Sequence, residues 1–90
     1  MNKMSAADIE ETLIQEVAVI LAVDSSTISS NASLHTLGVD SFSFVELLVF
    51  IEKTFNLKLM ESGLTRENFR TIHLLASYIS RMSWDNREKN

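Results

Sequence analysis

Apolar side chains recur every three or four positions in three separate stretches of the chain. In the first stretch, residues 6–22, the repeating positions are Ile9, Leu13, Val17, Ile20 and Leu21. This spacing places them on one face of an α-helix. Ser5, followed three residues later by Asp8, has the pattern of a capping box. We therefore predict that the first helix begins directly after Ser5.

A second amphipathic helix is predicted for residues 41–55, where the length of the run and its lack of strict alternation favour a helix over a strand. Its inner face is expected to carry Leu47, Leu48, Ile51 and Phe55. Its outer side is expected to carry Phe42, Val45, Glu46, Val49 and Glu52. This helix therefore combines a core face with an exposed face that is partly apolar.

A third helix is predicted for residues 72–82, with Thr71 as its N-cap. Its apolar stripe consists of Ile72, Leu75, Ala76, Ile79 and Met82. The following residues, 84–90, are mostly polar, and we expect this tail to fray.

The segments between these helices are rich in Ser, Thr and Asn, which favour turns and caps over helix interiors. The first, residues 23–37, is a long loop with room for a turn of helix at 32–36. Ile28, Leu34 and Leu37 are expected to anchor this loop to the core. The second contains Leu57 and Leu59, ends near Gly63 and leads to a short helical turn at 65–69, capped by Thr65 with Phe69 turned inward. We predict an all-α four-helix bundle, with three main helices, one short helix and a long first loop.

The composition agrees with a single helical domain over residues 1–90, with its core at about 6–83. The 90 residues include no proline and two glycines, and 46% of them are hydrophobic. No stretch approaches the roughly 20 uncharged apolar residues that span a bilayer, and residues 1–8 lack the apolar centre of a signal peptide. We expect a monomeric cytoplasmic protein without membrane insertion.

Charge is distributed unevenly along the chain, whose net charge is -4. No Lys or Arg occurs from Met4 to Glu52, whereas seven basic and four acidic residues follow from Lys53 onward. An acidic first half repels phosphate backbones, so nucleic-acid binding is not expected. It attracts partner proteins with basic surfaces instead.

The sequence offers little for intrinsic catalysis. It has no cysteine, and its two histidines, His35 and His73, are not accompanied by a nucleophile motif. It also lacks the metal and nucleotide motifs that can be recognised in sequence. We therefore expect a protein that is not an enzyme.

One short segment carries a more specific signal, although an Asp-Ser pair before a helix is by itself a common N-cap. The segment contains Gly38-Val39-Asp40-Ser41-Phe42, followed by Val45-Glu46-Leu47. It resembles the acyl carrier protein family, whose pattern is a glycine, one residue, Asp-Ser-Leu and a helix with Val-Glu-Leu. Segments 28–33, 71–72 and 76–79 are also similar, so the resemblance extends from about Ile9 to Met82.

The resemblance implies that Ser41 is the attachment point for 4′-phosphopantetheine, which a phosphopantetheinyl transferase takes from coenzyme A. The thiol of this arm carries an acyl group as a thioester. A phosphodiester at a helix N-terminus also suits the helix dipole. Gly38 is expected to allow a tight approach that leaves Ser41 exposed. By the same resemblance, Asp40 faces the modifying and partner enzymes.

The resemblance also assigns roles to the two faces of the second helix. The outer side would bind partner enzymes through Phe42, Val45, Glu46, Val49 and Glu52. The inner face would line an acyl pocket, unless it is ordinary core, through Leu47, Leu48, Ile51 and Phe55 together with Ile72, Leu75 and Ile79. The partners would be acyl-transferring, acyl-activating or condensing enzymes of fatty acid, lipid or polyketide biosynthesis.

The chain departs from the family pattern at several positions. Phe42 replaces the usual leucine, Lys53 stands where the helix is usually acidic, and Lys58, Arg66 and Arg70 make the next segment basic. These differences argue against a housekeeping role in fatty acid synthesis and leave a specialised carrier open. Two alternatives remain open from the sequence: a peptidyl or aminoacyl carrier of a peptide-synthetase-like pathway, and an unmodified acidic helical adaptor.

Overall fold

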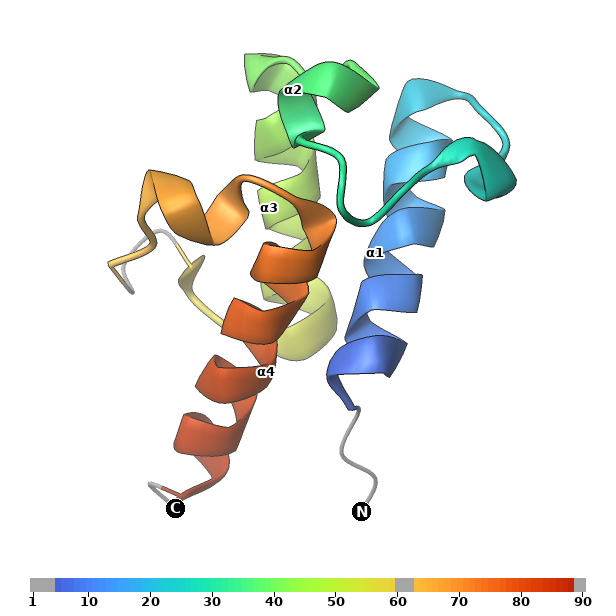
Figure 1. Cartoon of the computed structure of the whole chain (residues 1–90). Helices are drawn as coiled ribbons and strands as arrows, with labels where there is room; N and C mark the ends of the chain where they lie inside the picture. Colours follow the sequence, from blue (N-terminus) through green and yellow to red (C-terminus); the bar gives the residue numbers. More distant parts are fainter. Residues whose placement is uncertain (1–4, 60–62, 89–90) are drawn as a thin grey trace.

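The computed structural model describes residues 5–59 and 63–88, with side chains to residue 82, and shows helices packed around one core (Figure 1). Its elements are α1 (Ala6–Leu21), η1 (Ser25–Thr27), α2 (Leu34–Leu37), α3 (Ser41–Phe55), η3 (Arg66–Phe69) and α4 (Ile72–Glu88). Extended pairing in these ranges is limited to one isolated bridge between Ser33 and Thr71. The predicted all-α bundle with three long helices is confirmed.

Side-chain caps fix where the first two long helices begin. At α1, the Ser5 hydroxyl accepts the Asp8 N–H at 3.1 Å, and the Asp8 carboxylate accepts the Ser5 N–H at 3.3 Å, which confirms the predicted capping box. At α3, the Asp40 carboxylate accepts the Ser43 N–H at 2.8 Å. The left-handed residues Ala22 and Asn56 end these two helices. The observed bounds of α3 are those predicted, and α1 is one residue shorter than predicted.

α4 begins as predicted and continues further. The Thr71 hydroxyl accepts the Leu74 N–H at 3.0 Å, which confirms Thr71 as the N-cap. The helix extends to Glu88, beyond the predicted end at Met82, because neither glycine nor proline interrupts residues 83–88. Fraying of this tail stays a prediction, and residues 89–90 lie outside the described part of the chain.

The core lies between the three long helices, and α1 makes its most extensive contact with α4. The largest fully buried side chains come from α1, α3, α4 and the segment after α3: Ile9, Leu13, Val17, Leu47, Ile51, Leu59, Ile72, Leu75 and Ile79. The apolar stripes predicted from helical spacing are thus the surfaces that meet in the core.

The long first loop is held against the start of α4. Ile28 and Leu34 are buried, and Leu37 is partly buried against the same core. The Leu34 N–H donates to the Arg70 carbonyl, and the His73 N–H donates to the Ser30 carbonyl, both at 2.9 Å. These bonds explain how so long a connection keeps a defined path. The predicted helical turn forms two residues later than expected, with Ser33 as the N-cap of α2.

The second connection contains the short turn predicted before α4. It forms η3, where the Thr65 hydroxyl accepts the Asn68 N–H at 3.4 Å and the Asn68 side chain accepts the Thr65 N–H at 3.0 Å. Thr65 is therefore the predicted cap. Phe69 is partly buried and packs against the core, as expected.

We predict that Leu75→Ala lowers the free energy of unfolding by about 2–5 kcal/mol, because it leaves a cavity at a completely buried position of α4. Urea unfolding followed by circular dichroism measures the change. The control is Val19→Ala, at a position of α1 that is 72% exposed, where we expect a change within about 0.5 kcal/mol. Equal effects of the two substitutions would contradict the packing described.

Candidate functional site

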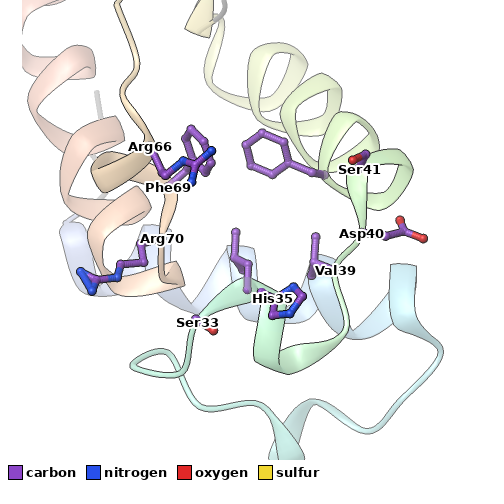
Figure 2. A pocket seen from close by; sticks show the side chains of 10 residues that line it. Ser33, His35, Val39, Asp40, Ser41, Arg66, Phe69 and Arg70 are labelled. Atoms are coloured by element: carbon purple, nitrogen blue, oxygen red, sulfur yellow. The ribbon is translucent and has the colours of Figure 1, made fainter.

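Ser41 is the first residue of α3 and is exposed to solvent. Figure 2 shows its side chain at the outer end of the first turn, while the Asp40 side chain points away from the neighbouring pocket. The first N–H groups of a helix have no acceptor within the helix, so they form a weakly positive surface at its start. Ser41 is therefore reachable by another molecule at a position that favours a bound anion.

Gly38 places Ser41 there through its backbone conformation. It ends α2 with φ of 104°, in the left-handed region that residues with a Cβ rarely adopt. A Cβ at this position would meet no atom within 4 Å. The expected tight approach at Gly38 is therefore wrong. The glycine is required for the turn between α2 and α3 and not for space.

Asp40 provides a negative charge directly beside Ser41. The Ser43 N–H, which donates to its carboxylate, lowers the pKa of Asp40 below its ordinary value. The carboxylate therefore stays ionised throughout the neutral range and caps α3 at the same time.

A pocket of about 430 Å³ lies beside Ser41, between α2, the start of α3 and η3 (Figure 2). The rings of Phe44 and Phe69 lie 4.7 Å apart between their centroids, with their planes tilted by 42°. We call this pocket the Ser41 groove, and its lining consists of Ser33, Leu34, His35, Val39, Asp40, Ser41, Phe44, Arg66, Phe69 and Arg70. The sequence indicated that Arg66 and Arg70 make their segment basic, but it gave no signal that they lie beside Ser41.

The outer side of α3 is exposed as predicted, with the exception of Glu52. Phe42 is 73% exposed, Val45 is 46% and Val49 is 43%, while Glu46 is exposed and Glu52 is half-buried. Large apolar side chains that remain in solvent next to carboxylates are typical of protein-binding surfaces.

α1 adds to this exposed side of α3, which the sequence did not predict. A second hollow of about 590 Å³ lies between the two helices and is lined by Glu16, Val19, Ile20, Val45, Glu46, Val49, Phe50 and Lys53. Helical spacing shows that Val19 is off the core stripe of α1, but it cannot show that Val19 lies beside Val45 and Val49. We call the exposed side of α3 together with Glu16 and Val19 the α1–α3 surface.

The residues predicted to line an acyl pocket are brought together inside the bundle. Leu47, Leu48, Ile51, Ile72, Leu75 and Ile79 are buried, and Phe55 is half-buried against them. They form part of the single hydrophobic core. A pocket for an acyl chain at this place stays a prediction.

The two histidines lie in different surroundings. His35 lines the Ser41 groove, whereas His73 contacts Glu10 across the α1–α4 interface, with Nδ1 2.8 Å from the carboxylate.

No group of three or more metal-ligating side chains occurs in the part of the chain that the structure describes. Within residues 5–59 and 63–88, none of the helices combines the length and hydropathy needed to cross a bilayer.

Comparison with known proteins agrees with this geometry. The whole chain, residues 1–90, matches the family described as the C-terminal ACP domain of the highly reducing polyketide synthase sdgA. It is 33% identical over 66 residues to an acyl carrier protein of Onion yellows phytoplasma (strain OY-M), and these residues are 72% of this chain and 84% of the relative. An acyl carrier protein of Aster yellows witches'-broom phytoplasma (strain AYWB) matches with the same identity and coverage.

A solved structure shares both the fold and part of the sequence. It is the NMR structure of the HMG-ACPI domain from the CurA module of Lyngbya majuscula, with a TM-score of 0.77 and 26% sequence identity. The similarity covers 96% of this chain and 85% of that domain. The chain therefore belongs to the acyl carrier protein family and functions as an acyl carrier.

Proposed function

We propose that Ser41 is the residue that carries a 4′-phosphopantetheine arm, and that acyl intermediates are bound to the thiol of this arm as thioesters. The observation that carries the proposal is the exposed Ser41 hydroxyl on the first turn of α3, beside a groove. A modifying enzyme can reach this hydroxyl without unfolding the bundle.

The residues at this position fit the group. The phosphodiester would lie at the positive end of the α3 dipole, where a helix start stabilises anions. The chain contains no cysteine, so it has no thiol of its own for thioester chemistry. When bound, the arm supplies this thiol.

Attachment is a transfer reaction in which the Ser41 hydroxyl is the nucleophile. The Ser41 oxygen bonds to the phosphorus next to the pantetheine of coenzyme A, and the bond from this phosphorus to the bridging pyrophosphate oxygen breaks. Adenosine 3′,5′-bisphosphate leaves, and a base of the transferase takes the hydroxyl proton. This chain presents the hydroxyl, and the partner enzyme performs the catalysis.

The same division of roles between the carrier and its partner enzymes applies to the reactions of the acyl cargo. We propose that this chain does not catalyse reactions of its cargo but presents it to acyl-transferring, acyl-activating or condensing enzymes. The match to a polyketide synthase carrier domain supports partners from polyketide biosynthesis. The acidic side of α3 supports partners with basic surfaces.

We predict that incubation with coenzyme A and a broad-specificity phosphopantetheinyl transferase adds one phosphopantetheine to the protein, and that Ser41→Ala abolishes the addition completely. Intact-protein mass spectrometry measures both results. Alanine is a good residue for the first turn of a helix, so the variant is expected to fold.

Ser43→Ala is the matched control, because Ser43 lies on the same turn and the variant keeps the backbone N–H that donates to the Asp40 cap. This variant should be modified like the unchanged protein. An unmodified protein, under conditions that modify another carrier, would instead favour the unmodified adaptor.

We also propose that partners dock on the α1–α3 surface. It combines the exposed Phe42, Val45 and Val49 with the carboxylates of Glu16 and Glu46. An apolar centre with acidic groups around it suits a basic partner that also buries apolar side chains. Lys53 is a basic exception at the edge of this surface.

Glu46→Lys is predicted to slow loading by the transferase several-fold at low salt, because it reverses a charge that attracts basic partners. The rates of modification at low salt and at 1 M salt measure the effect. The difference should shrink at high salt, since the screening length falls from about 10 Å at 0.1 M to about 3 Å.

Glu11→Lys is the control for this experiment. It makes the same change in net charge on the exposed surface of α1, where Glu11 accepts a hydrogen bond from Gln15 at 3.2 Å, away from the lining of the α1–α3 hollow. Equal loading rates for the two variants would show that the α1–α3 surface is not the contact.

A further inference from the structure

The Ser41 groove has the opposite charge to the outer side of α3. Its lining includes two arginines and a histidine, and the one carboxylate among its residues is that of Asp40. Figure 2 shows that the Asp40 side chain is directed away from the groove, where it accepts the Ser43 N–H. The space beside Ser41 is therefore a basic pocket on a protein with a net charge of -4.

The two arginines differ in how they are engaged. Arg70 pairs with Glu67, with contacts of 3.2 and 3.3 Å to its two carboxylate oxygens, and Figure 2 shows it turned away from the groove. Arg66 extends from η3 toward the α3 side of the groove (Figure 2). Among the residues that the structure describes, no carboxylate forms an ion pair with Arg66. Of the two arginines, Arg66 is thus the one whose guanidinium is directed into the groove.

Apart from Ser33 and Ser41, apolar side chains form the rest of the groove. Phe44 and Phe69 are in ring contact between α3 and η3, and Leu34 and Val39 contribute aliphatic surface. Such a lining favours a ligand with an apolar body, and one planar guanidinium at its edge favours a carboxylate that can accept two parallel hydrogen bonds.

We infer that the Ser41 groove binds an acyl cargo that ends in a free carboxylate, and that Arg66 is the residue that selects it. This inference rests on the proposed attachment of the arm to Ser41. A tethered cargo has a high effective concentration near the groove, so a single exposed ion pair is enough to shift its position. The cargo would lie over Phe44 and Phe69 with its carboxylate at Arg66.

The phosphate of the arm is the other anion near this site. It is bonded to Ser41 on the α3 side of the groove, where the helix start already stabilises it. Arg66 belongs to the opposite wall, on η3. The carboxylate of the cargo is therefore the better partner for Arg66, and the experiment separates the two anions.

The test compares two cargoes of the same shape, glutaryl and 5-methylhexanoyl, which differ in that a carboxylate replaces an isopropyl group. Each is loaded as its pantetheine thioester from the corresponding coenzyme A derivative, and mass spectrometry confirms loading. NMR then records the Arg66 Nε–H signal and the backbone amides of Phe44 and Phe69, relative to the protein with the bare arm.

We expect glutaryl to shift these signals at least twofold more than 5-methylhexanoyl. Arg66→Gln should reduce the glutaryl shifts at Phe44 and Phe69 to the level of the neutral cargo, and Arg66→Lys should retain part of them. Arg81→Gln is the matched control, because Arg81 is exposed on α4 near the Tyr78 ring and does not line the groove. It should leave the glutaryl shifts unchanged.

Equal shifts for the two cargoes, or glutaryl shifts that survive in Arg66→Gln, would overturn the inference. The Arg66 signal is also compared between the unmodified protein and the protein with the bare arm. A shift on attachment of the bare arm, with no addition from glutaryl, would also overturn the inference and assign the phosphate as the ligand. Failure to load any arm on Ser41 is visible by mass beforehand, and it would refute the proposed function itself. These outcomes are therefore distinguishable.

Discussion

Two local features, the left-handed backbone turn at Gly38 and the side-chain cap at Asp40, decide where Ser41 lies. Gly38 ends α2 with a φ of 104°, and Asp40 begins α3 by accepting the Ser43 N–H. Because the cap uses the side chain of Asp40, the Ser41 hydroxyl is left on the outside of the first turn. The buried side chains Leu47 and Ile51 then hold the remainder of α3 against the core, so the exposed hydroxyl is presented by a rigid helix.

The groove beside Ser41 depends on contacts between segments that are distant in sequence. Ser33 and Thr71 form a bridge, and the Leu34 N–H donates to the Arg70 carbonyl, so the first loop is joined to the start of α4. This junction brings η3 opposite the first turn of α3, where Phe69 meets Phe44. The same contacts that order a long loop therefore also create the second wall of the site.

α3 separates two surfaces of different chemistry. Its outer side, extended by α1, is acidic and apolar, whereas the groove at its start is basic and aromatic. Charges of opposite sign on two surfaces allow a partner protein and a tethered anionic group to be attracted to different places.

The sequence by itself determined the three long helices apart from the end of α4, their N-caps and the family. Local signals were sufficient for these features, because Ser5, Asp40, Thr65 and Thr71 each accept a backbone N–H three positions away, and apolar spacing defines a helix face without reference to other helices. The motif from Gly38 to Leu47 is equally local, and it is the basis for proposing Ser41 as the attachment residue.

Only the tertiary structure decided which helix faces and loops become neighbours. Nothing local to Val19 or Arg66 indicates that the first lies beside Val49 or that the second lies opposite Ser41. It also corrected the role of Gly38, since the open space around its Cα is a property of the packed surroundings. Neighbours of this kind result from how the buried stripes of three helices pack together. Periodicity along a chain indicates which face of each helix is buried, but not how the helices are placed relative to one another.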